Sequence, residues 1–456
     1  MIAKLSQLRF FGLHPQDKLV EPHGRICVYL AQEKETMYSS TVTLAYGTGT
    51  YDVNIPDSNL LGVYGVRESE SVVTQDESLI LRNALNNPIG TAPLRELVHP
   101  GVQVAIITSD LTRPCPSDRL LPPVLEELRA AGIPDKDILI VLALGVHRPM
   151  TEAEIDQTLS PEIHRRFRVL NHDPDNTVHL GETRRGTPVD IFRPVVEADI
   201  RICLGALEFH WFAGFSGGAK AILPGCASMA FVTKNHAMLV LPEAAGGRNE
   251  GNPLRADLEE GVSMLGVDFI LNVVLDPENR IQEAVAGDVI AAHRAGCELI
   301  SRRRKVYVPR KGDIVLASPG GYPKDINLFQ SHKGLENASH FVRQGGILIL
   351  VAECREMIGN QNFEDWMLTS KSPQDILERM EGQFILGGHK AAALAATELR
   401  IQVYLVSALP ADLARRMYMQ PFDTPQAALD HAMEELGLES QVIVLPHAIS
   451  ILPDFG

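Results

Sequence analysis

Seven short apolar runs, rich in β-branched residues, are spaced along the chain at intervals that leave room for helices. They lie at 102–108, 138–144, 201–206, 313–318, 346–351, 401–407 and 441–447. Runs of this kind are typical of strands buried on both faces of a parallel sheet. The pattern therefore predicts an α/β fold.

A helix is predicted between the first two runs, because leucine and valine recur at helical spacing after Ser117 and Gly132 with Pro134 supplies a stop signal. The connection from one parallel strand to the next should be right-handed, and such sheets bind ligands at the carboxyl ends of their strands. Polar residues that directly follow a run are therefore the first candidates for a site.

A second alternation of strands and helices begins after the basic stretch SRRRK at 301–305. We place a boundary near residue 303 and predict an N-terminal α/β domain at 1–303 and a C-terminal α/β domain at 304–456. A basic run this short more often solvates the end of a helix than binds nucleic acid.

Composition narrows the class of protein. The 456 residues are 45% hydrophobic and 22% charged, as in ordinary globular proteins, and the net charge of −15 argues against a nucleic-acid surface. The N-terminal residues 1–14 lack the features of a secretory signal, and no stretch reaches eighteen uninterrupted apolar residues. We expect a cytoplasmic protein with no membrane contact. The six cysteines form no metal-binding pattern and are expected to be reduced core residues.

The motif SDLTRP follows the first predicted strand and contains Asp110, Thr112 and Arg113. A hydroxyl, a guanidinium and backbone amides in one loop can bind an anion. The alternative is that Asp110 caps the next turn and pairs with Arg113. Only the position at the end of a buried strand favours the functional interpretation.

The motif GVHRP follows the next predicted strand and contains His147. An imidazole with a pKa near neutrality can act as a general base or acid there. A hydrogen-bonded structural histidine is the alternative. Because neighbouring parallel strands bring their carboxyl ends together, closeness to SDLTRP favours a role in catalysis.

A third motif, ALEFHWFAGFSGGAKAILPGCAS, follows the run at 201–206. It contains His210, Lys220 and the glycine pair Gly217 and Gly218, which let the backbone approach a ligand closely, and His236 comes sixteen residues after Lys220. The glycine spacing differs from that of a phosphate-binding P-loop. A lysine here can be a covalent anchor or Schiff-base residue, or a surface lysine on a flexible loop.

The fourth motif follows the strand predicted at 313–318. It places Gln330 and Lys333 three residues apart, on one face of a helix, where they can hold a carboxylate. His332 would point to another face, and we expect it to be structural or peripheral.

The ordered set DLTRP, GVHRP, EFHWFAGFSGGAK, KNH and NLFQSHK resembles the nickel-pincer nucleotide-dependent lactate racemase family, from about residue 38 to about residue 400. YGTGTYDVNIPDSNLLGV is similar to the opening strands of that family. The resemblance implies two Rossmann-like α/β domains with mostly parallel sheets and an interdomain active-site cleft.

The resemblance also implies a cofactor and site roles. The cofactor is a pyridinium-3,5-bisthiocarboxylic acid mononucleotide carrying Ni²⁺, covalently bound to Lys220, with His236 as the protein ligand to nickel. His147 and His210 would be the catalytic bases. The remaining roles are substrate binding by Arg113, Gln330 and Lys333, and cofactor contact by Asp110, Thr112, Gly217 and Gly218.

The implied reaction is racemisation or epimerisation of a small 2-hydroxy acid through a 2-keto acid. One base takes the hydroxyl proton while the α-hydride moves to the cofactor, and two bases serve the two enantiomers. Imidazole and sulfur suit nickel in a square-planar site. The implied partners are the 2-hydroxy acid and the carboxylase, sulfur insertase and nickel insertase that make the cofactor.

Two other functions are compatible with the strand pattern. One is a nucleotide-dependent 2-hydroxy acid oxidoreductase, although the chain has no GxGxxG turn. The other is a non-catalytic nickel or hydroxy-acid binding protein.

The resemblance leaves the substrate open, because members of the family act on lactate, malate, aromatic hydroxy acids and sugar acids. Phe329 stands where relatives often carry tyrosine.

Overall fold

The computed structural model describes residues 39–65, 76–276, 278–382, 385 and 387–456. The N-terminal segment and Cys27, on which parts of the localisation and cysteine predictions rest, lie outside the described residues. The other five cysteines are free thiols, four of them buried.

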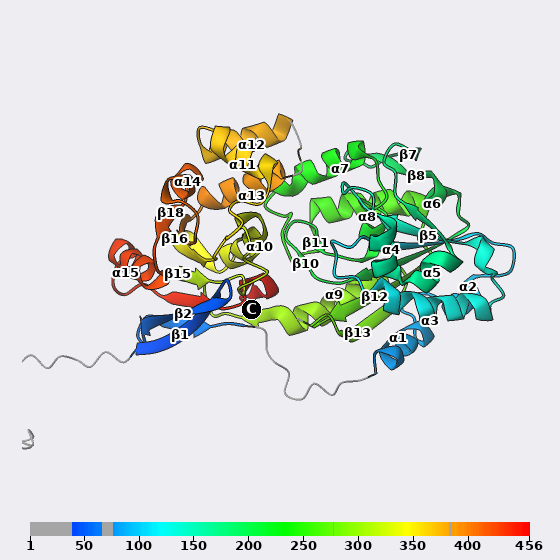
Figure 1. Ribbon diagram of the computed structural model, residues 1–456, viewed down its shortest axis with the longest axis horizontal. Coiled ribbons are helices and arrows are strands. Elements are labelled where there is room, and N and C mark those ends of the chain that lie inside the picture. Colours follow the sequence, from blue (N-terminus) through cyan, green and yellow to red (C-terminus); the bar gives the residue numbers. More distant parts are fainter. Residues whose placement is uncertain (1–38, 66–75, 277, 383–384, 386) are drawn as a thin grey trace, which may run out of the picture. The chain divides into compact units, whose positions relative to one another are not determined.

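The first sheet, whose strands β5, β12 and β13 are labelled in Figure 1, has the strand order β13-β12-β9-β4-β5-β6. All its neighbouring strands pair in parallel except the antiparallel pair of β12 and β13. The first three predicted runs are confirmed as strands of this sheet. Its members are β4 (Val104–Ser109), β5 (Ile138–Ala143), β6 (Arg168–Asn171), β9 (Ile200–Ala206), β12 (Phe269–Leu275) and β13 (Ile281–Gly287).

Helices cover both faces of this sheet because alternate strand residues point to opposite faces. Val104 and Ile106 share one apolar cluster with the helices from α1 to α5, whereas Ala105 and Ile107 share another with α6, α7 and α8. These helices are α1 (Glu77–Asn86), α2 (Leu94–Leu97), α3 (Ser117–Ala130), α4 (Glu152–Leu159), α5 (Pro161–Arg166), α6 (Arg193–Glu197), α7 (Met229–His236) and α8 (Pro253–Leu265).

The second sheet has the strand order β18-β17-β16-β15-β19-β3, and all its neighbours pair in parallel. The last four predicted runs are confirmed as strands of this sheet. Its members are β3 (Leu60–Val63), β15 (Gly312–Ala317), β16 (Val342–Val351), β17 (Gln402–Val406), β18 (Gln420–Phe422) and β19 (Val442–Leu445).

The two faces of the second sheet have different covers. Val315 and Leu348 pack with α10 to α13, whereas Ile314 and Ile347 pack with α15 and the hairpin of β1 and β2. The covering elements are β1 (Ser39–Tyr46), β2 (Gly49–Pro56), α10 (Leu328–Ser339), α11 (Gln361–Thr369), α12 (Pro373–Gly382), α13 (Gly388–Glu398) and α15 (Pro425–Leu436).

One strand of the second sheet comes from far outside the predicted C-terminal domain. β3 pairs in parallel with β19, so Leu60 lies opposite Val442. The boundary near residue 303 remains a prediction, but the sequence pattern did not indicate this contribution from the start of the chain. A short strand without a strong apolar run gives no clear signal.

The remaining elements are short or connect the sheets. The basic residues at 302–304 form the last turn of α9, where Arg302 and Arg303 pair with Glu298 and Glu283, as expected for a solvated helix end. The elements are β7 (Thr177–Glu182), β8 (Pro188–Phe192), β10 (Phe209–His210), β11 (Gly214–Phe215), α9 (Ala291–Arg304), β14 (Lys305–Tyr307), α14 (Ala411–Arg416) and β20 (Leu452–Asp454).

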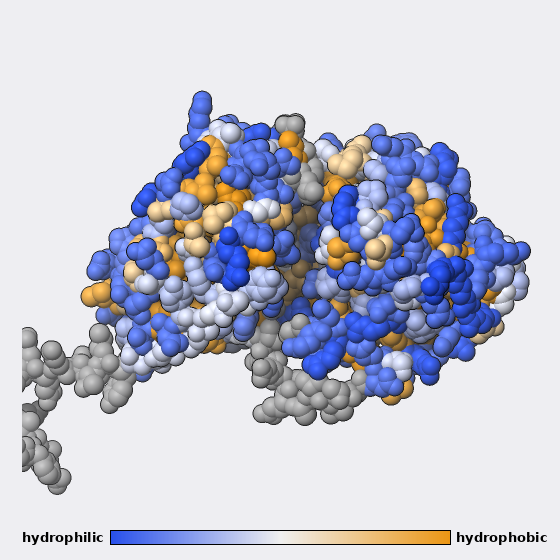
Figure 2. All heavy atoms as spheres, in the orientation of Figure 1, coloured by the Kyte–Doolittle hydropathy of each residue, from blue (hydrophilic) through white to orange (hydrophobic). Residues whose placement is uncertain are grey.

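The α/β fold with parallel-rich sheets is confirmed. Among the described residues, no helix combines the length and the apolar character needed to cross a bilayer. The face drawn in Figure 2 is mostly hydrophilic, with hydrophobic side chains scattered over it.

Candidate active site

Asp110 and His147 meet at the carboxyl ends of β4 and β5, which are neighbouring parallel strands. Nδ1 of His147 lies 2.6 Å from Oδ2 of Asp110, and Asp110 is buried. A carboxylate only accepts hydrogen bonds, so Nδ1 of His147 donates and the neutral ring keeps its lone pair on Nε2. The predicted proximity of the first two motifs is confirmed by this contact.

The other oxygen of Asp110 accepts a hydrogen bond from Oγ1 of Thr112 at 2.7 Å. Burial raises the pKa of Asp110, but hydrogen bonds from His147 and Thr112 and the nearby charge of Arg113 outweigh it, and the pKa falls below the usual value. Arg113 forms no ion pair with Asp110 in the described part of the chain. Of the predicted alternative, the Asp110–Arg113 pair is therefore not formed, whereas Oδ1 of Asp110 does accept from the backbone N–H of Thr112 at 3.3 Å.

Three candidate site residues, two of them from the third motif, lie around one aromatic ring. The ring of the buried Phe212 lies edge-on to His210 at 4.5 Å and to His236 at 4.9 Å between centroids. Nζ of Lys220 lies 5.8 Å from the same ring centroid. His210 comes from β10, Lys220 from the 3₁₀ turn at 218–221, and His236 ends α7. The fold thus brings together the predicted base, anchor and metal ligand.

The tight hairpin between His210 and Lys220 is held by Arg255 on α8. This arginine is fully buried and donates to the backbone carbonyls of Ala213, at 3.1 Å, and Phe215. Burial lowers the pKa of Arg255 to about 10. Gly214 has a positive φ of 76°, and a Cβ there would come within 2.2 Å of a backbone oxygen. Only glycine fits this turn.

Two buried side chains hold the glycine pair before Lys220. The backbone N–H of Gly218 donates to Oδ1 of Asn272 at 2.8 Å, and a Cβ on Gly218 would lie 2.6 Å from the ring of His293. His293 is itself fixed by a 2.9 Å contact between Nε2 and the carbonyl of Ser216. The glycines therefore serve close packing beneath the lysine.

The groups around Phe212 lie in a cationic environment. Burial and the charges of Lys220 and Arg113 hold the pKa of His210 well below its usual range. Burial and Arg113 have the same effect on the pKa of Lys220, and burial and Lys220 on the pKa of His236. Like charges in an enclosed space disfavour protonation. Burial and neighbouring positive charge thus favour the neutral forms of His210 and Lys220.

His210 is oriented differently from His147. Its Nδ1 accepts a hydrogen bond from the backbone N–H of Ala213 at 3.3 Å. A neutral imidazole has one donor and one acceptor nitrogen, so this contact places the proton of neutral His210 on Nε2.

Gln330 and Lys333 both lie on α10, as predicted, near its N-terminus. The side chain of Asn327 caps the helix by accepting from the backbone N–H of Gln330 at 2.9 Å. The surrounding protein and the charge of Arg113 lower the pKa of Lys333, while Glu208 opposes the shift. The charge of Arg113 lowers the pKa of both Lys333 and Lys220. The candidate residues of the two domains are therefore close enough to interact electrostatically.

Trp211, the residue after His210, reaches residues of the second domain. Its ring stacks on His389 with centroids 5.9 Å apart and 19° between planes, and it meets His332 edge-on at 6.1 Å. His332 is buried, in agreement with its predicted structural role.

Two family models match this chain: the lactate racemase N-terminal domain over residues 46–247 and the lactate racemase C-terminal domain over residues 308–452. The lactate racemase of Thermoanaerobacterium thermosaccharolyticum is 33% identical over 423 residues, which are 91% of this chain and 99% of that protein. The chain belongs to the lactate racemase family.

Further members of the lactate racemase family agree. The lactate racemase of Lactiplantibacillus plantarum is 31% identical over 421 residues, covering 90% of this chain and 99% of that protein. The structure of the lactate racemase apoprotein from T. thermosaccharolyticum matches with a TM-score of 0.82 and 32% identity over 91% of this chain and 100% of that one. A Thermotoga maritima protein, 19% identical with a TM-score of 0.57 over 83% of this chain and 98% of that one, shares the fold.

The family resemblance predicted from the motifs is confirmed, and the protein is an isomerase of the racemase class that acts on hydroxy acids. The individual site roles stay predictions. The structure adds residues that sequence reasoning missed: Phe212, Asn272, His293, Arg255 and Lys390. Asn272 interrupts the apolar stretch of β12, which is a usable signal, whereas Arg255 and His293 sit on helices with nothing to mark them.

The residues fit a nickel-carrying organic group bound to Lys220. His236 lies against the same ring as Lys220, and the glycine pair lets the turn that carries Lys220 pack directly on Asn272 and His293. In the described part of the chain, no three His, Cys, Asp or Glu side chains gather where they could hold a metal ion. A nickel ion here would therefore take most of its donors from the bound group and one from His236.

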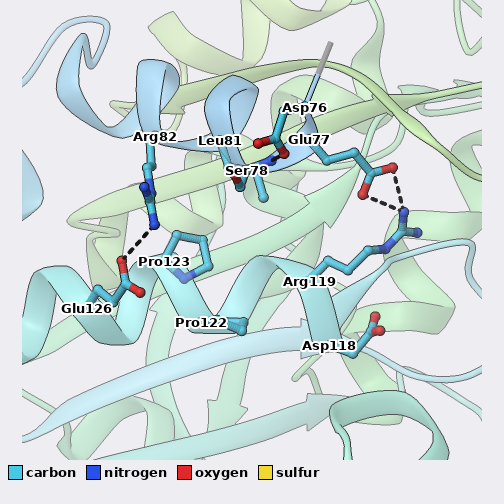
Figure 3. A pocket seen from close by; sticks show the side chains of 10 residues that line it. All are labelled: Asp76, Glu77, Ser78, Leu81, Arg82, Asp118, Arg119, Pro122, Pro123 and Glu126. Atoms are coloured by element: carbon cyan, nitrogen blue, oxygen red, sulfur yellow. Dashed lines mark hydrogen bonds and ion pairs between the residues drawn. The ribbon is translucent and has the colours of Figure 1, made fainter. Parts of the chain in front are cut away.

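A separate cavity of about 410 Å³ lies between α1 and α3 (Figure 3). Two ion pairs cross it, between Arg119 and Glu77 and between Arg82 and Glu126. None of its lining residues belongs to the four motifs, so this cavity is not part of the candidate site.

Proposed function

We propose that this protein interconverts the enantiomers of a small 2-hydroxy acid, with lactate as the first candidate, using a nickel pincer nucleotide covalently bound to Lys220 and ligated by His236. The convergence of His210, Lys220 and His236 on the ring of Phe212, in a lactate racemase family member, carries the proposal. When bound, the cofactor supplies a hydride acceptor beside the substrate α-carbon.

His147 is the first proton acceptor. Its Nδ1–H donates to Asp110, so Nε2 is free to take the proton of the substrate hydroxyl. The imidazolium that forms is stabilised by the buried carboxylate of Asp110, which stays ionised because its pKa is low. For the enantiomer that His147 serves, the proton returns from Nε2 when the hydroxyl is restored.

His210 acts on the face of the substrate carbon opposite His147. In its neutral form Nε2 carries the proton and donates a hydrogen bond to a substrate oxygen, which stabilises negative charge there. It takes up a proton on Nε2 only after its tautomer changes. Both histidines are needed, and they begin the reaction in different hydrogen-bonding states.

The substrate carboxylate is held by Arg113, Lys333 and Gln330. Two cations and an amide can bind both carboxylate oxygens and fix the α-carbon while it becomes planar. Carboxylate binding also offsets the mutual repulsion of Arg113 and Lys333.

Loading of the cofactor onto Lys220 requires a carboxylase, a sulfur insertase and a nickel insertase as partners. We place the enzyme in the cytoplasm.

The test is intact-protein mass and nickel content after expression with and without the cofactor-synthesis enzymes. We expect an added mass on Lys220 and about one nickel per chain only when those enzymes are present. Lys220→Ala should lose the adduct, while Lys234→Ala, which changes an exposed lysine of α7, should keep it. An unmodified mass in the presence of active synthesis enzymes would contradict the proposal.

Two further measurements exclude the other functions. A racemase exchanges or inverts the α-hydrogen of the 2-hydroxy acid without net oxidation, whereas a dialysable dinucleotide and accumulating 2-keto acid would indicate an oxidoreductase. Binding of nickel and hydroxy acid without turnover would indicate a binding protein. His147→Ala and His210→Ala should each abolish turnover and retain the adduct.

A further inference from the structure

The first turn of α13 touches both halves of the candidate site through two consecutive residues. His389 stacks on Trp211, the neighbour of His210. Lys390 reaches the first turn of α10, where its Nζ donates to the carbonyl of Phe329 at 2.5 Å and lies 3.8 Å from the centre of the Phe329 ring. Gln330 directly follows Phe329, so Lys390 holds the turn that presents it.

Burial of the Lys390 ammonium destabilises the fold. Its side chain is almost completely buried, and the neighbouring cations are Lys333 and Arg113. Burial and these two charges lower its pKa to about 7. An apolar side chain of similar length would avoid the desolvation of a buried ammonium, which costs several kcal/mol. Stability therefore does not explain a lysine at this position, and a role in the site does.

No carboxylate compensates this charge. Lys390, Lys333, Lys220 and Arg113 form no ion pair with any described Asp or Glu. The protein partners of the Lys390 ammonium are instead the Phe329 carbonyl and the Phe329 ring face, which bind a cation directionally. Both belong to the first turn of α10, so the interaction constrains that turn rather than neutralising a charge.

We propose that Lys390 is a positioning residue that fixes the first turn of α10, so that Gln330 and Lys333 face the carboxylate of the substrate. The inference rests on the proposed function, because it assigns Gln330 and Lys333 to carboxylate binding. Lys390 itself does not contact the substrate. It acts through the backbone of Phe329.

The kinetic consequence follows from when the carboxylate is bound. Gln330 and Lys333 hold it equally in the ground state and in the transition state, so a displaced turn weakens both. Lys390→Met should therefore raise KM for lactate about 10-fold and leave kcat within about two-fold, since one charge-assisted hydrogen bond is lost. Lys390→Arg keeps a donor and a cation for the ring, and should restore most of the affinity.

The experiment compares Lys390→Met, Lys390→Arg and the exposed control Lys136→Met in the cofactor-loaded enzyme, with lactate as substrate and malate as substrate or competing ligand. If Lys390 positions the first turn of α10, Lys390→Met should lose the same affinity for lactate and for malate. Lys390→Arg and Lys136→Met should keep most of it. A loss confined to malate would overturn the proposal, because it would make Lys390 a direct ligand of a second carboxylate. An unchanged KM would overturn it as well.

Amide hydrogen exchange supplies a readout that needs no turnover. Exchange of the amides of residues 328–333 should rise in Lys390→Met, relative to wild type and Lys136→Met, while the amides of 218–222 stay unchanged. Unaltered exchange in α10 would overturn the positioning role even if KM rose. If wild type turned over no 2-hydroxy acid, the proposed function would fail, and the exchange result would still decide whether Lys390 orders this turn.

Discussion

The two candidate bases, His147 and His210, stand in opposite electrostatic surroundings. His147 shares a 2.6 Å hydrogen bond with a buried carboxylate, Asp110. His210 has no carboxylate partner among the described residues, and burial, together with the charges of Lys220, Arg113 and Arg255, lowers its pKa. The carboxylate beside His147 can stabilise a positive charge on that ring, whereas burial and nearby cations favour the neutral form of His210.

In the proposed reaction, a pair of bases would therefore need no structural symmetry to serve two enantiomers. An Asp–His pair stabilises imidazolium, while a ring surrounded by cations stays a neutral donor until a ligand anion reduces the local positive charge. The negative charges of substrate and cofactor would then raise the pKa of His210. In the proposed reaction, ligand binding rather than a fixed carboxylate would prepare this second histidine.

The largest effect is expected from removing the carboxylate that distinguishes His147. Asp110→Asn should lower kcat by about 10³-fold, because an amide neither stabilises imidazolium nor enforces the Nδ1–H tautomer. Intact mass should show an unchanged adduct on Lys220. The exposed control Asp412→Asn should behave like wild type, and an Asp110→Asn enzyme within ten-fold of wild type would contradict the assignment of His147.

A second change should make the surroundings of the two histidines more alike. Arg113→Met removes a cation near His210, so the pKa of His210 should rise while the Asp110–His147 hydrogen bond persists. Nitrogen-15 NMR of labelled histidine measures both. We also expect KM to rise about 100-fold, because a charged hydrogen-bonding group for the carboxylate is lost. A His210 pKa that does not move would show that burial alone depresses it.

The proximity of Asp110 and His147 could be predicted from the sequence. Most of the contacts that support His210 and Lys220 could not. Asp110 and His147 follow two long apolar runs, and adjacency of parallel strands brings such residues together. The support of His210 and Lys220 comes from Phe212, Arg255, Asn272 and His293. Three of these come from α8, β12 and α9, and their contacts depend on packing between elements rather than on local pattern.

The sequence also did not separate the roles within a motif. The prediction that Asp110 contacts the cofactor or supports Arg113 is not tested, and the sequence did not indicate that its two carboxylate oxygens bind Thr112 and His147. The direction in which a loop side chain points depends on turn geometry, which a single sequence specifies weakly. Strand positions, in contrast, were predicted to within a few residues because buried strands have long apolar runs.

A smaller change tests whether the turn that carries Lys220 and the Asp110–His147 pair are structurally independent. Gly218→Ala would press a Cβ against His293 and strain a backbone with φ of 58°, so the unfolding free energy should fall by about 1–3 kcal/mol. Adduct formation on Lys220 should slow, while the Asp110–His147 hydrogen bond stays intact. Gly186→Ala is the matched control, because its φ is 70° with no neighbour within 4 Å.

The smallest expected effect is in acid stability. Folding lowers the pKa of Asp110, so its ionised form contributes stability above the unfolded value of 3.8, and that contribution is lost as pH falls through the lower folded value. The difference in unfolding free energy between wild type and Asp110→Asn should therefore shrink between about pH 5 and pH 3. Chemical denaturation at several pH values measures it, and a difference that grows toward acid would contradict the lowered pKa.

The pairing of β3 with β19 has a consequence for the newly made protein. Leu60 leaves the ribosome long before Val442, its partner in the sheet. At a translation rate of about 5–20 residues per second, β3 waits roughly 20 to 75 seconds while the whole first sheet is synthesised and folds. The second sheet therefore closes only at the end of synthesis, and the early strand must stay available, without aggregating, until the last strand arrives.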